Sequence, residues 1–420
     1  MLDRKSAPQF VEIVTSNLPS PEITTLNNGV PLIQFDKVNQ EVLRIELIFK
    51  AGKWCEPKVG VSYFTSHLLD KGTKSKSSFQ IAEIFDQFGS SVEISAGSDF
   101  VSVSLFTLTK NVNKVLPLFC EIAHYPSFPD SEFTLLKDIF RQNLKINNEK
   151  SSYLASKAIR QNIFGSNHPY GSSVTEGDLD LLTRQDLVDF FQTKFNLHEV
   201  YITGKVDSSI KKILIKNLSE FPITIQPQVQ SVISESPEVK IQHIQKPESI
   251  QSSIRLGKKT INRSNPDYPS LVLLNHILGG YFGSRLMKNI REEKGLTYGI
   301  NSSIHALKND AFLLIGTDVN KENRSLAVSE IKSEIKRLQE EDIDLAEVET
   351  AKHHLLGSLQ LETANPFSVL EKIKTIRLHD LNSDFYSILF KGIQVSNPDK
   401  LTRIAQAHLN ENRFFELSVG

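Results

Sequence analysis

The sequence has only two cysteines, Cys55 and Cys120, in 420 residues. Two cysteines are too few for a disulfide framework, and their spacing does not match a metal knuckle. The opening segment, residues 1–8, also lacks the apolar core of a signal peptide. We therefore expect a protein of a reducing compartment and assign it to the cytoplasm.

The sequence also lacks an excess of either charge and any long apolar run. It has 48 basic and 49 acidic residues, for a formal net charge of −1. This balance gives no electrostatic reason to expect nucleic acid or an anionic membrane as a partner. No apolar run approaches the roughly 20 residues that span a bilayer. What is present is a globular composition, 39% hydrophobic and 23% charged, with a length typical of two or three domains.

The first half of the chain shows the periodicities of one mixed unit of helices and strands. Residues 42–49 alternate apolar and polar side chains, which predicts a strand. The same reasoning predicts further strands at 91–96, 100–108 and 199–204, and helices at 60–69, 77–89, 111–124, 128–140, 152–164 and 183–195.

A second copy of this pattern follows a proline-rich segment. Four prolines and a polar run occupy 221–247, which lacks helical periodicity and predicts a linker. Beyond it, residues 275–278 repeat residues 66–69 at an offset of 209, and Gly420 repeats Gly204 at an offset of 216. Because these two offsets are so similar, they indicate an internal duplication.

The duplication predicts the fold class and the domain boundaries. We expect an α+β protein of two tandem homologous units, each a mostly antiparallel sheet covered by helices. The N-terminal unit covers 1–220, the linker covers 221–247 and the C-terminal unit covers 248–420.

The segment from Gly60 to Thr73, GVSYFTSHLLDKGT, points to a known family. Its leading glycine and its Lys-Gly-Thr ending resemble the first helix of the pitrilysin/insulinase family of inverted zincins, especially the subunits of mitochondrial processing peptidase. In that family the helix carries H-x-x-E-H, whose histidines bind one zinc ion while the glutamate polarises a water molecule. The resemblance covers both units and the linker, and it implies the family's half-clam-shell fold.

The zinc motif itself is degenerate in this chain. Tyr63 stands at the position of the first histidine, Ser66 at the position of the catalytic glutamate, and only His67 remains. The resemblance places the third ligand, a glutamate on a later helix, at Asn143. A phenol, an imidazole and an amide make a weak zinc site, and a hydroxyl has no useful basicity at pH 7. We therefore expect no metal and no hydrolysis here, and we interpret His67 as a helix histidine bonded to a neighbour.

The second unit keeps a different motif. Arg291 and Tyr298 lie seven residues apart in a segment, GSRL followed by REEKGLTY, that resembles the family without interruption. The resemblance implies that they hold the substrate backbone opposite the zinc and stabilise the developing oxyanion, for which guanidinium and phenol are strong donors. Taken singly, Arg291 fits a helix cap or ion-pair partner and Tyr298 an ordinary strand residue. The preceding glycines, Gly279, Gly280 and Gly283, predict a tight helix–helix turn or a flexible substrate-facing loop.

The resemblance implies a subunit that is not catalytic alone. In the family, two chains of two units each divide the work, one with the zinc motif and one with the arginine–tyrosine pair. We therefore expect the non-catalytic, substrate-binding subunit of a heterodimeric zinc metallopeptidase, with no cofactor of its own. Zinc is expected in a homologous partner subunit, the substrate is a peptide or unfolded segment, and the isolated chain is compatible with a homodimer.

Two alternatives stay open from the sequence. The first is an inactive scaffold or peptide-binding homologue. The second is a zinc peptidase with nonstandard ligands, in which His67 recruits other residues such as His124 or Glu149.

Overall fold

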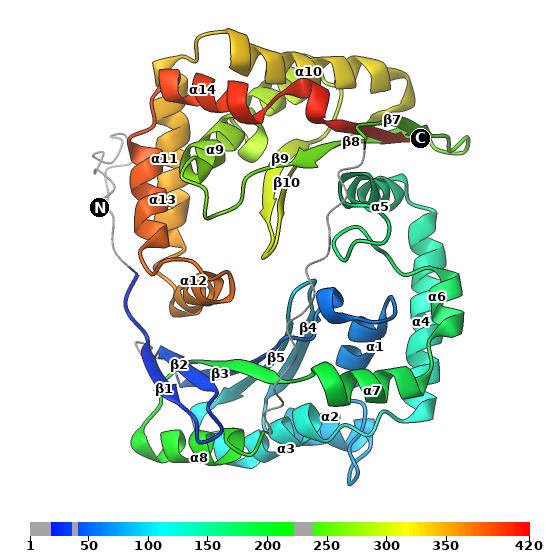
Figure 1. Ribbon diagram of the computed structural model, residues 1–420, viewed down its shortest axis with the longest axis vertical. Coiled ribbons are helices and arrows are strands. Elements are labelled where there is room, and N and C mark those ends of the chain that lie inside the picture. Colours follow the sequence, from blue (N-terminus) through cyan, green and yellow to red (C-terminus); the bar gives the residue numbers. More distant parts are fainter. Residues whose placement is uncertain (1–17, 36–40, 222–237) are drawn as a thin grey trace, which may run out of the picture.

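The computed structural model describes residues 18–35, 41–221 and 238–420, which form two α+β units (Figure 1). The first unit, coloured from blue to green, lies below the second, coloured from green to red. Each unit consists of one sheet and the helices that cover it. The predicted fold class is confirmed.

The first unit is built on a six-stranded sheet in the order β1-β2-β6-β3-β5-β4. Its strands are β1 (Glu22–Thr25), β2 (Pro31–Phe35), β3 (Val42–Phe49), β4 (Ser91–Ala96), β5 (Val101–Leu108) and β6 (Leu197–Thr203). All neighbours are antiparallel except β2 and β6, which are parallel. The predicted strands at 42–49, 91–96 and 100–108 therefore lie together on one side of this sheet.

The second unit repeats five of these six strands in the same order. Its order is β7-β11-β8-β10-β9, which corresponds to β2-β6-β3-β5-β4 of the first unit. The strands are β7 (Ile241–Ile244), β8 (Gln251–Lys259), β9 (Ile300–Ala306), β10 (Ala311–Asn320) and β11 (Phe415–Val419). Here too a single pair, β7 with β11, is parallel. The shared topology confirms the duplication that the sequence offsets predict.

The helices follow the same repeat. The first unit has α1 (Val61–His67), α2 (Ser78–Gln87), α3 (Val112–His124), α4 (Asp130–Asn148), α5 (Ser151–Phe164), α6 (Glu176–Leu181), α7 (Arg184–Lys194) and α8 (Ser208–Leu218). The second has α9 (Tyr268–Asn275), α10 (Arg324–Glu340), α11 (Leu345–Leu361), α12 (Pro366–Leu378), α13 (Phe385–Gln394) and α14 (Pro398–His408). Capping boxes at Ser77 and Thr183 satisfy first-turn N–H groups and fix the starts of α2 and α7 near the predicted positions.

In each unit, one helix packs against the sheet of the other unit. The α5 helix packs on β8 and β11, and the α12 helix packs on β6. A Cβ at Gly257 would lie 2.8 Å from Ile163, so glycine there lets α5 approach the sheet closely. Because α5 and α12 hold equivalent places in the two units, the exchange is reciprocal and joins the units through two apolar clusters. One contains Ala155, Ile159, Ile163, Phe164, Tyr170, Phe312, Phe415, Leu417 and Val419, and the other Ile33, Phe35, Ile48, Tyr201, Val369, Leu370, Ile373 and Leu378.

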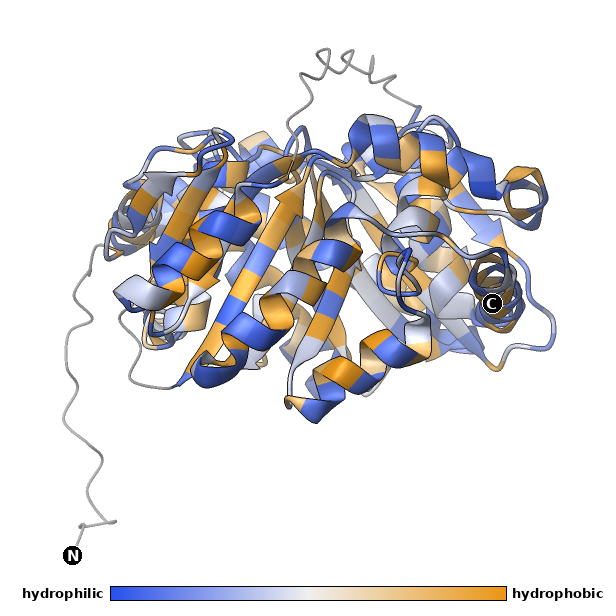
Figure 2. Ribbon diagram, turned by 90° about the horizontal axis from the view of Figure 1, so that it is seen from below, coloured by the Kyte–Doolittle hydropathy of each residue, from blue (hydrophilic) through white to orange (hydrophobic). Residues whose placement is uncertain are grey.

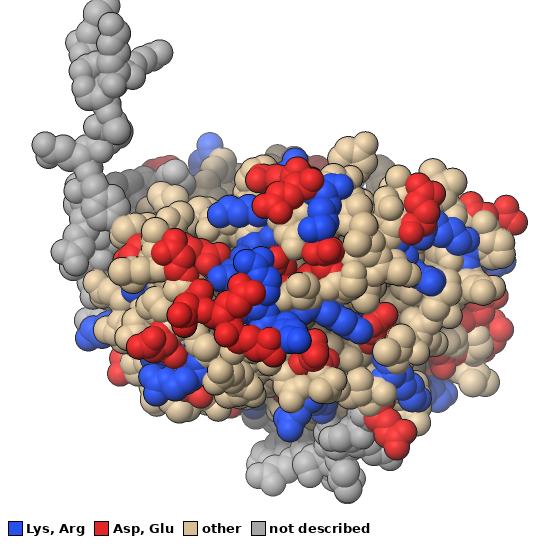
Figure 3. All heavy atoms as spheres, turned by 90° about the horizontal axis from the view of Figure 1, so that it is seen from above, with Lys and Arg blue, Asp and Glu red and all other residues tan. Residues whose placement is uncertain are grey.

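The surface agrees with the charge balance of the sequence. Surface helices in Figure 2 carry a hydrophobic side and a hydrophilic side, as amphipathic helices of a globular protein do. On the face seen in Figure 3, Lys and Arg side chains are interspersed with Asp and Glu. Within the described parts of the chain, no helix combines the length and the apolar character needed to cross a bilayer.

The predicted linker differs from the structure at its end. Residues 222–237, most of that segment, lie outside the described residues. Beyond them, Ile241–Ile244 form β7 at the edge of the second sheet. Because the side chains of β7 are mostly exposed, the strand depends on backbone pairing with β11 and has no buried face to mark it in the sequence.

Candidate functional site

The helix with the degenerate zinc motif, α1, is fixed at its start and along its buried face. It begins after Gly60, whose φ of 94° lies in the left-handed region that favours glycine. Phe64 is fully buried in the core of the first unit and anchors the helix there. The structure therefore holds the motif positions on a rigid element.

Tyr63 and His67 stack on each other where the family's two histidines would face a metal. Their ring centroids are 3.9 Å apart with an interplanar angle of 27°. His67 Nδ1 donates a hydrogen bond to the carbonyl of Tyr63 at 2.8 Å, and Phe140 of α4 packs edge-on against Tyr63. Burial raises the pKa of the Tyr63 phenol, which keeps it protonated and makes it a poor metal ligand.

Ser66 faces the interior of the protein. It is fully buried, and its Oγ donates to the carbonyl of Ser62 one turn earlier at 2.6 Å. The Ser62 hydroxyl in turn donates to the carbonyl of Ala51 at 2.6 Å. The hydroxyl at the position of the catalytic glutamate is therefore bonded to the backbone in the protein interior and is not exposed.

The remaining candidates for a metal site are exposed or have other partners. Asn143 is exposed on α4. His124 stacks on Phe221 at 5.1 Å, and Glu149 pairs with Lys246 at 3.6 Å, so both residues of the rearranged-site alternative have other partners. In residues 18–35, 41–221 and 238–420, no three His, Cys, Asp or Glu side chains gather as a metal ion would require. The donors at the motif positions, one imidazole and a phenol on α1 with an amide on α4, do not fit zinc.

A half-buried carboxylate, Glu56, holds the N-terminal end of α1. Its Oε2 accepts hydrogen bonds from the backbone N–H groups of Gly60 at 3.1 Å and Ser62 at 3.3 Å. Burial outweighs these bonds and raises the pKa of Glu56 from 4.5 to about 7. Because the folded-state pKa is the higher one, the stability linked to this proton is fully present below the unfolded pKa. It is lost as the pH rises through about 7.

We predict that Glu56→Gln raises the free energy of unfolding at pH 8 by about 2 kcal/mol and changes it little at pH 5. Glutamine keeps an acceptor oxygen for both N–H groups but carries no charge to bury. Denaturant unfolding of the parent and the variant at pH 5, 6.5 and 8 measures this difference. An equal effect at all three pH values would show that Glu56 does not titrate in this range.

In the second unit, two π-helical stretches lie on either side of the turn that contains Gly283. They span His276–Gly280 and Met287–Glu293, and π-helices are rare elements that recur at functional sites. Gly279 and Gly280 end the first stretch, and the backbone of Gly279 is not helical (φ −159°, ψ 15°), so the helix beyond α9 kinks there. Gly283 lies in the turn that follows.

The three glycines of this segment, Gly279, Gly280 and Gly283, differ in how deeply they are buried. A Cβ at Gly279 would stand 2.7 Å from Ser302 of β9, so this buried glycine allows the helix to pack directly on the strand. Gly280 is exposed and Gly283 is half-buried. Of the predicted substrate-facing loop, only these two positions therefore reach the surface.

A packed group of rings lies beneath this turn. His276 Nε2 is 3.0 Å from Nδ1 of His354 on α11, and the Tyr281 ring stacks on His276 at 4.5 Å. Burial lowers the pKa of His276 to about 4, so its imidazole is neutral at pH 7. The rings thereby fasten the turn to α11.

In the described parts of the chain, neither Arg291 nor Tyr298 makes a contact on which the fold depends. Arg291 lies in the last turn of the second π-helical stretch, and its guanidinium carbon lies 4.7 Å from the centre of the Phe282 ring, which is 61% exposed. Among the described residues Arg291 forms no hydrogen bond and no ion pair, so it neither caps nor braces the helix. Tyr298 stands before β9 with 95% of its surface exposed. Each of the two residues therefore keeps unused hydrogen-bond donors.

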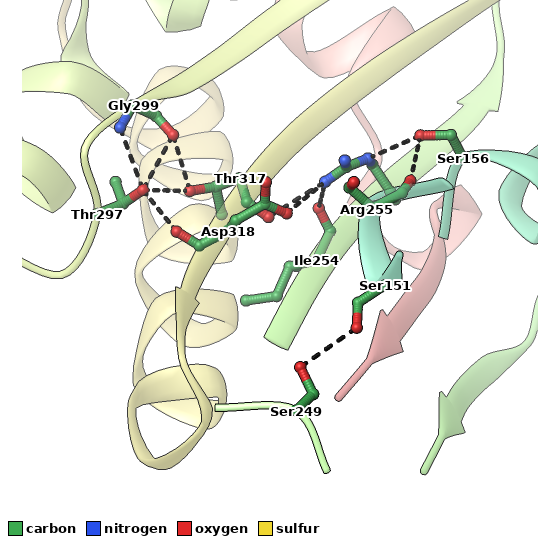
Figure 4. Close-up of polar contacts among 10 residues, drawn as sticks. Ser151, Ser156, Ser249, Ile254, Arg255, Thr297, Gly299, Thr317 and Asp318 are labelled. Carbon is green, nitrogen blue, oxygen red and sulfur yellow. Dashed lines mark hydrogen bonds and ion pairs between the residues drawn. The ribbon is translucent and has the colours of Figure 1, made fainter. Parts of the chain in front are cut away.

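A cavity of about 360 Å³ opens beside Tyr298. Arg255 of β8 forms its wall and is held by its neighbours, as Figure 4 shows. Its Nη1 donates to the carbonyls of Ile254 at 2.8 Å and Thr317 at 3.1 Å, and its Nε donates to Ser156 of α5 at 3.4 Å. Sequence reasoning missed this feature; the one available signal was a glycine, Gly316, inside the strand pattern of β10.

The fold and the site define a class of protein: a duplicated α+β chain built like a subunit of an inverted-zincin peptidase, whose first helix lacks a zinc donor set. Residues 34–176 match the family model Insulinase (Peptidase family M16), and residues 181–355 match the model Peptidase M16 inactive domain. The chain therefore belongs to the insulinase family, peptidase family M16.

Known relatives span nearly the whole chain. The uncharacterized zinc protease YmxG of Bacillus subtilis is 25% identical over 356 residues, which cover 83% of this chain and 86% of the relative. The non-peptidase homolog YmxG of Helicobacter pylori is 23% identical over 414 residues, covering 96% and 94%. The crystal structure of a peptidase M16 inactive domain from Pseudomonas fluorescens superimposes with a TM-score of 0.85 at 22% identity, covering 95% and 98%, and shows the same fold.

Proposed function

We propose that this chain is the non-catalytic, substrate-binding subunit of a heterodimeric zinc metallopeptidase. It acts on peptides or unfolded segments and supplies Arg291 and Tyr298 opposite the zinc site of its partner. One observation carries the proposal: the same chain presents an unused Arg291/Tyr298 pair and has no usable ligand set on α1.

The first support is the loss of metal chemistry at α1. Protein sites extract roughly 10–16 kcal/mol from structural zinc with complete sets of charged or imidazole ligands. Here a stacked phenol replaces one ligand and an exposed amide another. Ser66, which would replace the general base, is fully buried, and its hydroxyl donates a hydrogen bond to a backbone carbonyl. Neither metal binding nor water activation has a structural basis at this helix.

The second support is the state of the donors in the second unit. A guanidinium that only stacks on an exposed ring keeps its N–H groups for a ligand, and a phenol with 95% exposure keeps its O–H group. Both groups donate well to a carbonyl oxygen that gains charge. A scaffold has no need of such donors, whereas an oxyanion site requires them.

The partner supplies what this chain lacks. We propose a homologous subunit with H-x-x-E-H, as in the processing peptidases, which holds the zinc ion while this chain closes the chamber. The balanced surface charge favours a protein partner and a peptide substrate over nucleic acid or a membrane surface. We assign the complex to the cytoplasm, with a homodimer as the form compatible with the isolated chain.

The isolated chain is expected to hold much less than one zinc ion per molecule and to cleave no unstructured peptide in a chelator-sensitive way. The physical reason is the donor set at Tyr63, His67 and Asn143, which does not fit zinc. Elemental analysis after dialysis and a quenched-fluorescence peptide assay measure both quantities. A stoichiometric zinc ion that is lost in His67→Ala would instead establish the peptidase with nonstandard ligands.

Co-expression with a candidate subunit that carries H-x-x-E-H tests the heterodimer itself. We expect the two chains to co-purify as a 1:1 complex by size-exclusion chromatography. A chain that stays alone beside every such subunit of its own organism would leave the scaffold as the better explanation.

A further inference from the structure

The cavity beside Tyr298 exists because β10 has a glycine where its neighbours have long side chains. Gly316 pairs with Arg255 of β8 on one side and with Asn301 of β9 on the other. Side chains in such a row point to the same face of a sheet. A Cβ at Gly316 would lie 3.3 Å from Cδ of Arg255, so the missing side chain gives the guanidinium room to lie across the strand. It also leaves a cavity of about 360 Å³ with a backbone floor, enough for one side chain of a ligand.

The walls of this cavity offer a donor and an acceptor side by side. Arg255 is fixed by its bonds to Ile254, Thr317 and Ser156, and its side chain is 12% exposed (Figure 4). In the described structure its Nη2 has no hydrogen-bond partner. Asp318, which lines the same cavity, has a carboxylate oxygen 3.5 Å from Nη1, and its side chain is 44% exposed. The charges of this pair cancel, while the hydrogen-bonding capacity of both groups remains available.

This pairing discriminates between classes of side chain. A carboxylate or an ammonium group that entered the cavity would meet one opposite charge and one like charge, and would lose its hydration. An apolar side chain would cover the donor and the acceptor and leave both unpaired, which costs about 1–3 kcal/mol for each buried group. A primary amide offers one acceptor oxygen and two N–H donors, so it can satisfy Arg255 and Asp318 together.

We propose that this cavity is a specificity subsite for a glutamine or asparagine side chain of the bound peptide. The proposal rests on the proposed function, because Tyr298, which would hold the peptide backbone, also lines the cavity. The peptide residue beside the one held by Tyr298 then places its side chain on the floor at Gly316. Gln251 and Asn301 line the same space and add two amide groups for hydrogen bonds.

The test uses the full chain and fluorescein-labelled unstructured peptides that differ only at one central residue: glutamine, leucine, glutamate or lysine. Fluorescence anisotropy measures each Kd. We expect the glutamine peptide to bind about tenfold more tightly than the leucine peptide, as two satisfied hydrogen bonds would give. Gly316→Val fills the cavity floor and should abolish this preference, whereas Ser303→Val introduces the same side chain on β9 outside the lining and should keep it.

Asp318→Asn provides a second variant with almost unchanged volume at a partly exposed position. It leaves the charge of Arg255 unbalanced, so the preference should move from glutamine to glutamate. Peptides that bind equally well whatever their central residue, or a preference that survives Gly316→Val, would overturn the subsite and leave the proposed function intact. If none of the peptides binds to the chain, the proposed function fails and the subsite fails with it.

Discussion

In a heterodimer with a zinc-bearing partner, Arg291→Ala and Tyr298→Phe should each lower kcat by about 10²–10³-fold. Loss of one preorganised oxyanion donor typically costs roughly 3–4 kcal/mol of transition-state stabilisation. Because the donated hydrogen bonds strengthen only as charge develops on the carbonyl oxygen, the loss should fall mainly on kcat and less on KM.

The structure also predicts that these variants stay folded. The contact of Arg291 with the exposed Phe282 ring is worth about 0.5–1 kcal/mol, and Tyr298 is 95% exposed. Melting temperature and complex formation should therefore match the parent. Lys288→Ala, at an exposed position of the same π-helical stretch, is the matched control and should keep the parental kcat. Variants that assemble, melt and cleave like the parent would remove Arg291 and Tyr298 from the mechanism.

Restoring two ligands on the existing helices should create a zinc site. Tyr63→His places a second imidazole one turn before His67 on α1, and Asn143→Glu places a carboxylate on α4, which packs on α1 through Phe140. At a free zinc concentration one hundred times Kd, binding to the folded state adds about 2.7 kcal/mol. For a unit of this size that corresponds to a rise in Tm of roughly 5–10 °C.

Thermal scans with and without zinc measure this rise, and the parent should show none. His67→Ala added to the double variant should abolish the effect, which separates a designed site from adventitious binding. Ser66→Glu is left out because Ser66 is fully buried, and a carboxylate there would be buried without a partner. If the double variant folds but its Tm does not respond to zinc, the alignment of α1 with the zincin helix is wrong.

Much of the fold could be predicted because it depends on local patterns that the duplication repeats. The alternation at 42–49, the helix starts near Ser77 and Thr183, and the repeated order of elements between units are all found in the structure. The exchange of α5 and α12 could not be predicted, because an apolar helix face does not say which sheet it covers. The edge strand β7 was missed because its side chains are mostly exposed.

The candidate site, like the fold, could be predicted from the sequence only in part. Residue identities were enough to locate the degenerate motif and the arginine–tyrosine pair. They were not enough to show that Tyr63 stacks on His67, that Ser66 is buried, or that the segment before Arg291 is π-helical. The Arg255 cavity was missed because it arises from three strands whose register only the folded sheet brings together.

The central claim is that activity needs this chain and a zinc-bearing partner together. The most direct test titrates the partner with this chain at fixed partner concentration and follows peptide cleavage. The account predicts that each chain alone is nearly inactive, that activity rises linearly to a break at one equivalent, and that titration with Arg291→Ala reaches a plateau about 10²–10³-fold lower. A partner that cleaves at its full rate without this chain, or a plateau that Arg291→Ala leaves unchanged, would contradict it.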